Sequence, residues 1–229
     1  MNCICVIPAR GGSKRIPKKN IKDFSNKPLI AWSIESAIKS NIFKDIFVST
    51  DDLEIKKIAE SYGANVPFIR PKELSDDFAR DIDVRNHFIN WFNKKYKDRI
   101  DILCYLYATA PFISPETLIG CKNDLLKYDC GSVFTVSEYC FSPLRALIQK
   151  KDGKLDYFFK KYSDIRSQDL PKLMHDAGQC YFFNLNKNNY ETDRLGYKIS
   201  RFHSQDIDTE EDLEFAKVLF NFLKQKNYN

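Results

Sequence analysis

The stretch "CICVIPARGGSKRIPKKN", Cys3 to Asn20, places a short apolar run directly before two adjacent glycines and a group of basic residues. The run Cys3–Ala9 predicts a buried first strand, and in an open α/β sheet the loop that leaves such a strand lies where ligands bind. Gly11 and Gly12 let the backbone approach an anion closely. Full positive charges come from Arg10, Lys14, Arg15, Lys18 and Lys19. This loop therefore predicts either a polyphosphate site or a solvated basic surface loop, and its spacing matches neither the ATPase nor the dinucleotide motif.

Apolar runs alternate with helix-like segments along the remaining chain, which predicts an α/β domain with a mainly parallel sheet. Further strands are expected at 45–50, 66–70, 100–107, 131–136, 179–185 and 196–203. Helices are expected at about 28–39, 53–62, 84–96, 115–127 and 209–225, with Asp51 or Asp52 capping the second. From Glu138 the rhythm changes to a hairpin around Gly153 and a polar, irregular stretch. We interpret residues 1–229 as a single domain with an insertion at 138–177.

The composition is that of an ordinary globular chain, with 43% apolar and 29% charged residues. The formal charge of +5 is compatible with nucleic acid, an anionic membrane or a small anionic ligand. No apolar stretch is long enough for a membrane span, and the amino terminus does not resemble a signal peptide. The seven cysteines have no zinc-site spacing, so we expect reduced core thiols in a cytoplasmic protein.

A second candidate site lies near the carboxyl terminus, in "HSQDIDTEED" at 203–212. Asp206 and Asp208 are two residues apart, so in extended chain both carboxylates face the same side. Such a pair suits Mg²⁺, which takes oxygen ligands and commonly bridges carboxylates to substrate phosphates. The alternative is a helix start, since Thr209 and Asp212 form a capping-box-like pair and acidic residues favour the first turn of a helix. The alternative leaves Asp206 unexplained.

Five blocks, in order along nearly the whole chain, resemble the CMP-sialic acid synthetase (acylneuraminate cytidylyltransferase) family. They are "IPARGGSKRIPKKN" at 7–20, "STDD" at 49–52, "VPFIRPKELSDD" at 66–77, "SPLRAL" at 142–147 and "QDIDTEEDLEFA" at 205–216. The stretch "RSQDLPKLMHDAGQCYFF" at 166–183 most resembles the branch that acts on pseudaminic acid, a bacterial nonulosonic acid. The resemblance implies a Rossmann-like sheet flanked by helices, of the nucleotide-diphospho-sugar transferase type.

The resemblance also implies a reaction, the transfer of CMP from CTP to the anomeric hydroxyl of a nonulosonic acid with release of pyrophosphate, and a requirement for Mg²⁺. Nucleotidyl transfer needs in-line positioning and charge neutralisation rather than covalent chemistry by the protein. By similarity, the triphosphate should be held by Arg10, Lys14, Lys19 and Asn20, with the backbone of Gly11, Gly12 and Ser13 beside them. Lys19 would stabilise the departing pyrophosphate, and Asp206 and Asp208 would hold the metal. Arg70 and Ser75 match positions around the cytosine and ribose.

The sugar acid presents a carboxylate, which arginine can grip with two parallel hydrogen bonds. The resemblance suggests Arg145 and Arg166 for this contact, with Gln168, His175, Asp176 and Gln179 as further polar residues near the sugar. His175 is one candidate general base, and a metal-assisted deprotonation is another. The chain reads "ATAPFI" at 108–113 where the sialic acid enzymes have "QPTSPLR". Thr109 persists as a nucleotide contact, whereas Tyr107 and Ile113 replace the glutamine and arginine.

The insertion at 138–177 corresponds to the dimerisation region of this family, so a homodimer is expected. Its residues Phe141, Leu144, Tyr157 and Phe158 would otherwise form an exposed apolar patch. The resemblance places the protein in sialic acid-like sugar biosynthesis and flagellin glycosylation, with no nucleic acid or membrane partner. Three alternatives remain open: the same reaction on legionaminic, N-acetylneuraminic or another keto-deoxy sugar acid, a non-catalytic nucleotide-sugar binding protein, and a nucleic-acid binder.

Overall fold

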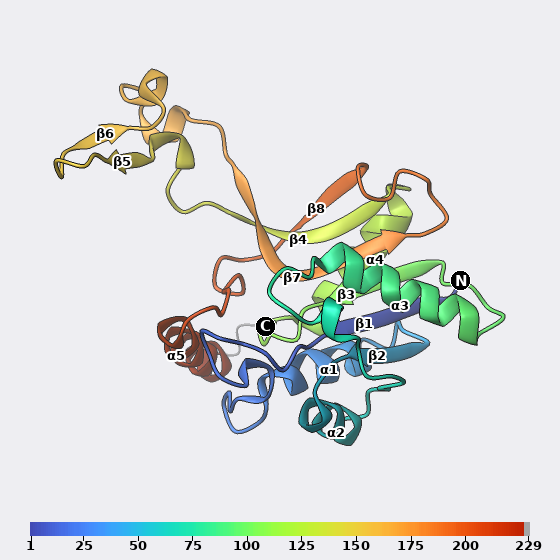
Figure 1. Cartoon of the computed structure of the whole chain (residues 1–229). Coiled ribbons are helices and arrows are strands. Elements are labelled where there is room, and N and C mark those ends of the chain that lie inside the picture. Colours follow the sequence, from blue (N-terminus) through green and yellow to red (C-terminus); the bar gives the residue numbers. More distant parts are fainter. Residues whose placement is uncertain (227–229) are drawn as a thin grey trace.

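A six-stranded sheet forms the centre of the molecule in the computed structural model, which describes residues 1–226 (Figure 1). Its strands, in spatial order, are β2 (Asp45–Ser49), β1 (Cys3–Pro8), β3 (Ile102–Leu106), β7 (Met174–Asn184), β4 (Ser132–Glu138) and β8 (Arg194–Lys198). Only β7 among them runs antiparallel to its two neighbours. The predicted α/β fold with a mainly parallel sheet is therefore confirmed. The carboxyl ends of the five parallel strands share one edge.

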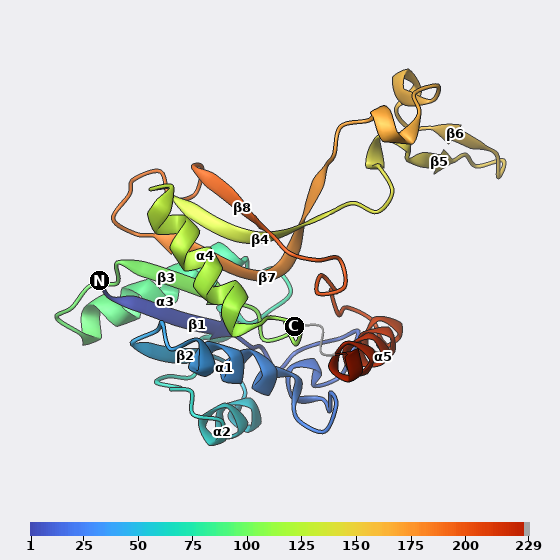
Figure 2. The ribbon, with the colours of Figure 1, turned by 180° about the vertical axis from the view of Figure 1, so that it is seen from behind.

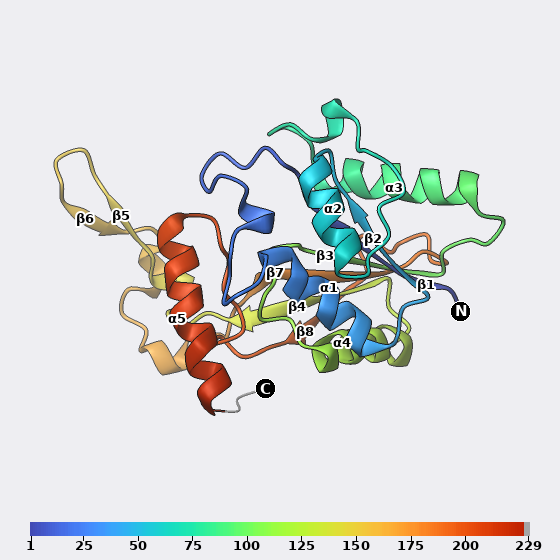
Figure 3. The same cartoon turned by 90° about the horizontal axis from the view of Figure 1, so that it is seen from below.

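Helices cover both faces of this sheet, as Figures 2 and 3 show from two further directions. The main core cluster packs one face against α1 (Leu29–Ser40), α2 (Leu53–Ser61) and α4 (Pro115–Lys127). A second, aromatic-rich cluster lies between the other face and α3 (Asp81–Lys95). The last helix, α5 (Glu210–Lys226), packs instead against the segment that follows β1, through Phe24, Leu29 and Phe220. This third cluster brings the two ends of the chain together.

Short polar side chains cap the starts of α2 and α4. Asp52 caps α2, because its Oδ1 accepts hydrogen bonds from the backbone N–H groups of Glu54 (2.7 Å) and Ile55 (3.0 Å). This identifies Asp52, rather than Asp51, as the predicted cap. Ser114 likewise accepts from the N–H of Thr117 in the first turn of α4. Each such cap stabilises its helix by about 1 kcal/mol. Gly63 ends the second helical segment in the left-handed region, with a φ of +93°.

The element boundaries differ from the prediction in four places. The last strand, expected at 196–203, spans Arg194–Lys198. Residues 66–70 form no strand. Two isolated bridges join this part of the chain to the sheet edge, one between Asn65 and Phe47 of β2 and one between Ile69 and Thr50, the residue that follows β2. The third helix begins at Asp81 rather than at 84. The prediction missed this first turn because Asp81 and Asp83 are polar and do not extend the apolar stripe of the helix. Strand β7 begins at Met174 rather than at 179. Its polar first residues continue pairing with β4 beyond a register shift between Phe134 and Val136.

An arm leaves the body between β4 and β7 and projects away from the sheet (Figures 1 and 2). It comprises residues 139–173 and contains a small hairpin of β5 (Leu147–Gln149) and β6 (Leu155–Tyr157). The predicted insertion at 138–177 overlaps this arm, although 174–177 belong to β7. Several large apolar side chains of the arm are exposed, among them Phe141 at 89% and Leu155 and Phe158 at 61% each. Exposure on this scale is unusual for a surface without a partner.

The cysteines follow the prediction with one exception. All seven are free, and six lie in the interior, where burial raises the pKa of Cys3 to about 12. Cys140 is exposed at the base of the arm, so it is not the core thiol that we expected. Within residues 1–226, no helix combines the length and the apolar character that a membrane crossing requires.

Candidate active site

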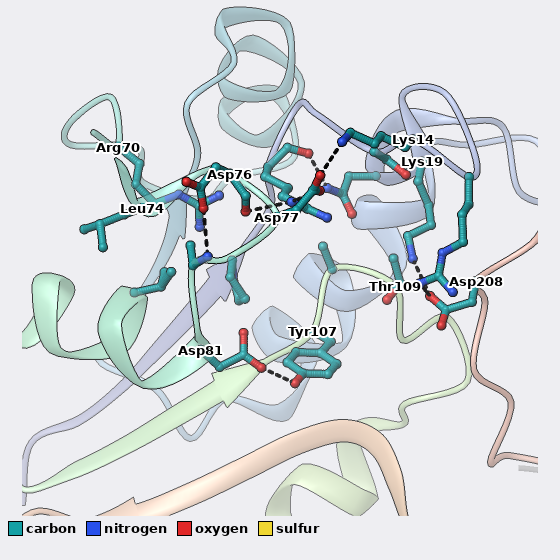
Figure 4. Close-up of a pocket in the computed structure, with 18 of the residues that line it drawn as sticks. Lys14, Lys19, Arg70, Leu74, Asp76, Asp77, Asp81, Tyr107, Thr109 and Asp208 are labelled. Atoms are coloured by element: carbon teal, nitrogen blue, oxygen red, sulfur yellow. Dashed lines mark hydrogen bonds and ion pairs between the residues drawn. The ribbon is translucent and has the colours of Figure 1, made fainter. Parts of the chain in front are cut away.

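A pocket of about 600 Å³ opens at the carboxyl ends of β1 and β3 (Figure 4). Four separate stretches line it: the loop after β1, residues 70–84, residues 105–109 and Asp208. Eight of the predicted site residues reach this pocket, namely Arg10, Ser13, Lys14, Lys19, Asn20, Arg70, Thr109 and Asp208. The structure therefore brings the basic loop and the acidic carboxyl-terminal segment into one site, although some 190 residues separate them in sequence.

Two carboxylates hold the positive charges of the loop in place. Asp77 pairs with Arg10 Nη1 at 2.9 Å and with Lys14 Nζ at 2.5 Å. Asp208 pairs with Arg15 Nη2 at 2.9 Å and with Lys19 Nζ at 3.2 Å. Hydrogen bonds from Lys14 and Arg10 lower the pKa of Asp77 below its usual range. The cations thus converge on one space, as a site for several adjacent phosphates requires.

Glycine and asparagine shape the start of the loop. Gly11 donates its N–H to Asp51 Oδ1 at 2.9 Å, and a Cβ at Gly11 would lie 2.7 Å from Asp52 Oδ2. A larger residue would therefore displace the loop from the first turn of α2. The buried Asn20 donates from Nδ2 to the carbonyl of Arg10 at 2.9 Å and closes the loop. Asn20 fixes the backbone that carries the charged side chains.

The two ends of the chain meet at Lys19. Its Nζ donates to the carbonyl of Ile207 at 2.7 Å as well as to Asp208, and its side chain is only 18% exposed. Neighbouring Asp206 has a pKa raised above its usual range, first by loss of water around the carboxylate and then by the negative charge of Asp208. A divalent cation would relieve that repulsion.

The alternative assignment of these acids to a helix cap accounts for only part of the cluster. Asp212 Oδ2 accepts from the N–H of Thr209 at 2.7 Å, and Thr209 Oγ1 accepts from the N–H of Asp212 at 3.2 Å. These two residues form the predicted reciprocal cap, which leaves the side chains of Asp206 and Asp208 outside it. Within residues 1–226, no group of three or more histidine, cysteine or acidic side chains could hold a metal ion. The described residues therefore offer Asp206 and Asp208 as a carboxylate pair, and such a pair suits Mg²⁺ completed by water and phosphate oxygens.

Arg70 lies at the inner end of the pocket. It is only 4% exposed, and its Nε donates to Ser75 Oγ at 3.0 Å, while Ser75 donates to the carbonyl of Pro71 at 2.9 Å. Burial is the main cause of the lowered pKa of Arg70. Ser75 does not line the pocket, so its contact in the structure is with Arg70 and not with the cavity.

The predicted sugar-binding residues lie elsewhere. Arg145 and Gln168 line a separate cavity of about 460 Å³ at the base of the arm, and Arg145 Nη1 is 3.2 Å from Ser167 Oγ. Arg166 pairs with Asp169 at 2.7 Å on the exposed surface of the arm. Gln179 is buried in β7 and donates to the carbonyl of His203. None of these four residues lines the nucleotide-sized pocket of its own chain.

Two further residues considered from the sequence also lie away from this pocket. Ile113, which replaces an arginine of the family motif, is buried in the main core. His175 lies on β7, with Nδ1 at 2.8 Å from the carbonyl of Asp176 and its ring against Tyr139. Neither residue lines the pocket, so the geometry does not favour His175 as the general base.

Sequence reasoning missed an acidic and aromatic group in the same pocket. Its members are Asp76, Asp77, Asp81 and Tyr105, together with Tyr107, which the sequence marked only as a replaced glutamine. Asp81 accepts hydrogen bonds from Tyr105 Oη at 3.0 Å and from Tyr107 Oη. The available signal was the acid-rich stretch "SDDFARD" at 75–81, which resembles an ordinary polar loop until the fold places it beside β3.

Comparison with known proteins gives consistent results. A family model described as cytidylyltransferase matches residues 4–228. A pseudaminic acid cytidylyltransferase of Campylobacter jejuni is 40% identical over 96% of this chain and 97% of its own length. The post-translational flagellin modification protein B of Campylobacter coli is 31% identical over 98% of this chain and 96% of its length. Among solved structures, a CMP:2-keto-3-deoxy-manno-octonic acid synthetase complexed with CTP superposes with a TM-score of 0.70 at 16% identity, covering 97% of this chain and 99% of that one.

Proposed function

The chain belongs to the cytidylyltransferase family, and we propose that it transfers CMP from CTP to the anomeric hydroxyl of a nonulosonic acid, with pseudaminic acid as the preferred substrate. Pyrophosphate is the second product. The observation that carries this proposal is the convergence of Arg10, Lys14 and Lys19 with Asp208 in one pocket. The 40% identity to the Campylobacter jejuni enzyme supports pseudaminic acid as the sugar.

The residues of the pocket would act through position and charge. Arg10 and Lys14 would bind the triphosphate, in exchange for their present pairing with Asp77. Lys19 would stabilise the negative charge that develops on the leaving pyrophosphate, because its Nζ is held at a fixed point by Ile207 and Asp208. Arg70 would contact the cytidine at the inner end, where its fixed guanidinium presents several donors. Thr109 adds a hydroxyl to the same wall of the pocket.

The donor set suits Mg²⁺ as the cofactor, held by Asp206 and Asp208. The repulsion between these two carboxylates supports an ion that binds one or two carboxylates, keeps several waters and contacts substrate phosphates. When bound, Mg²⁺ would neutralise charge on the phosphate oxygens and lower the pKa of the sugar hydroxyl.

We propose that the protein is a homodimer, with the insertion at 138–177 as its dimerisation and sugar-binding part. The exposed apolar side chains of the arm support this arrangement, and Arg145, Arg166 and Gln168 would then enter the pocket of the other subunit. Light scattering coupled to size exclusion should give a dimer for the wild type and a monomer for the variant Phe141→Asp combined with Leu155→Asp. Val218→Asp, which alters an exposed apolar residue of α5, serves as the control and should remain dimeric. A monomeric wild type would contradict the proposal.

Incubation of the purified protein with CTP, Mg²⁺ and a panel of sugar acids tests the activity. The panel contains pseudaminic, legionaminic, N-acetylneuraminic and 2-keto-3-deoxy-octonic acids, and pyrophosphate release is followed for each. We expect the highest kcat/KM with pseudaminic acid. Preference for another member would replace the substrate assignment, and no release with any member would refute the enzymatic function.

A cytoplasmic location fits a chain whose seven cysteines are all unpaired.

A further inference from the structure

Two carboxylates and three tyrosines form a continuous group that begins in the pocket and extends into a neighbouring cavity. We call it the acceptor wall: Asp81, Tyr105, Tyr107, Tyr181 and Asp176. Figure 4 shows Asp81 and Tyr107 joined by a hydrogen bond in the pocket lining. Tyr105 also donates to Asp81, at 3.0 Å, and Tyr181 donates to Asp176 Oδ2 at 2.8 Å. The rings of Tyr107 and Tyr181 lie 5.5 Å apart and connect the two halves.

The five side chains of this wall offer hydrogen-bond acceptors to a ligand and no free O–H donor. A phenol has a single proton, and each of the three tyrosines already donates that proton to a carboxylate. Burial and the neighbouring carboxylates raise the pKa of Tyr105 and Tyr107, so both phenols keep their protons. The remaining lone pairs of Asp81 and Asp176 can pair only with O–H or N–H groups. A carboxylate or an ether oxygen of a ligand finds no partner on Asp81 or Asp176. Its donors would be arginines of the two spaces, such as Arg70 in the pocket and Arg85 and Arg194 in the neighbouring cavity.

Both carboxylates are accessible to a ligand. Asp81 and Asp176 are exposed, whereas the tyrosines that hold them are partly or fully buried. Asp81 and Tyr107 line the 600 Å³ pocket, and Asp176 and Tyr181 line a second cavity of about 250 Å³. The Tyr107–Tyr181 contact lies between these two spaces. The wall thus continues from the pocket that holds the basic loop into a space large enough for part of a sugar.

We propose that Asp81 and Asp176 are specificity-determining residues that accept hydrogen bonds from hydroxyl or acylamino N–H groups of the sugar acid. This inference rests on the proposed function and concerns the sugar half of the same site. The charges of Asp81 and Asp176 repel the carboxylate of the sugar acid, so that it would face the cationic residues of the two spaces instead. A reversed sugar would place three carboxylates together, which is unfavourable in a partly buried pocket.

Asp81→Asn and Asp176→Asn test the proposal, because each keeps the side-chain shape, removes the charge and introduces an N–H donor. Loss of a charged hydrogen bond should raise KM for the sugar acid about tenfold or more in each variant. KM for CTP should stay within about twofold of the wild type, if the wall contacts the sugar and not the nucleotide. Asp83→Asn is the matched control, since Asp83 lies in the same helical turn as Asp81 but pairs with Arg80 outside the pocket. It should leave both constants unchanged.

Calorimetric titration of CTP into each variant distinguishes a specific effect from misfolding, since a folded variant still binds the nucleotide. The proposal is overturned if sugar KM is unchanged in both variants, or if KM for CTP rises while sugar KM does not. An inactive wild type would instead refute the proposed function.

Discussion

Replacing Lys19 with methionine should abolish most of the catalytic power of this protein while leaving its fold intact. Lys19 joins the basic loop to the carboxyl-terminal acidic segment. Its Nζ donates hydrogen bonds both to the carbonyl of Ile207 and to the carboxylate of Asp208. Methionine retains the length and apolar body of the side chain and removes only the charge and its donors. The change therefore isolates the electrostatic role that we assign to this residue.

The size of the effect follows from the contacts of Lys19. Its side chain is only 18% exposed, so a hydrogen bond to a pyrophosphate oxygen is partly protected from water and is worth about 2–3 kcal/mol. At 1.36 kcal/mol for each factor of ten, kcat/KM should fall roughly 30-fold to 150-fold. The cost in folding stability is smaller, at about 1 kcal/mol, because Arg15 still pairs with Asp208 and only the Ile207 carbonyl loses its donor.

The assay is pyrophosphate release at saturating sugar acid and varied CTP, with thermal unfolding as the measure of stability. Lys22→Met is the matched control, because Lys22 also pairs with an acid of the carboxyl-terminal region, Glu210 at 2.6 Å, but does not line the pocket. It should leave kcat/KM unchanged. The assigned role of Lys19 is refuted if the kcat/KM of Lys19→Met stays within about threefold of the wild type, or if kcat/KM falls as far in Lys22→Met as in Lys19→Met.

Three further results are expected. Asp206→Asn should raise the Mg²⁺ concentration needed for the half-maximal rate. Because the pKa of Asp206 is raised, the wild type should lose activity as the pH falls through that raised value, and added Mg²⁺ should restore the activity. A Mg²⁺ dependence that is identical in both proteins would contradict the metal assignment. Arg70→Lys should raise KM for CTP about tenfold and leave sugar KM unchanged, since lysine lacks the planar fork; equal effects on both substrates would argue against a cytidine contact. Leu118→Ala, in the fully buried face of α4, should cost about 2–5 kcal/mol in urea unfolding without changing KM, and a loss below about 1 kcal/mol would show a looser core.

Local sequence was sufficient for the elements that carry a strong periodic or terminal signal. The predicted helix at 115–127 coincides with α4, because Ser114 and Pro115 mark its start and its apolar face follows the helical period. The start of β7 was missed, since its first residues are polar and are held in the sheet by pairing with β4 beyond a bulge. Residues 66–70 look like a strand locally, but their single bridge, Ile69 with Thr50, is isolated and forms no ladder.

The site divides in the same way. Lys19 and Asn20 were recognisable because they belong to one contiguous block that resembles the family. Asp81 was not recognisable, because its place in the site depends on hydrogen bonds from Tyr105 in β3 and from Tyr107 just after it. Arg145 and Arg166 were expected near the sugar, and the single chain holds them on an arm that extends away from its own pocket.

By itself, the sequence determined the alternation of strands and helices, the basic loop and the acidic pair, since backbone propensity, apolar periodicity and side-chain charge are all properties of neighbouring residues. Only the tertiary structure decided that the loop and Asp208 share one pocket, and that Asp81 and Asp176 accept the protons of three tyrosines. Such contacts join residues far apart in the chain, and no local pattern records which distant group will lie opposite a given side chain.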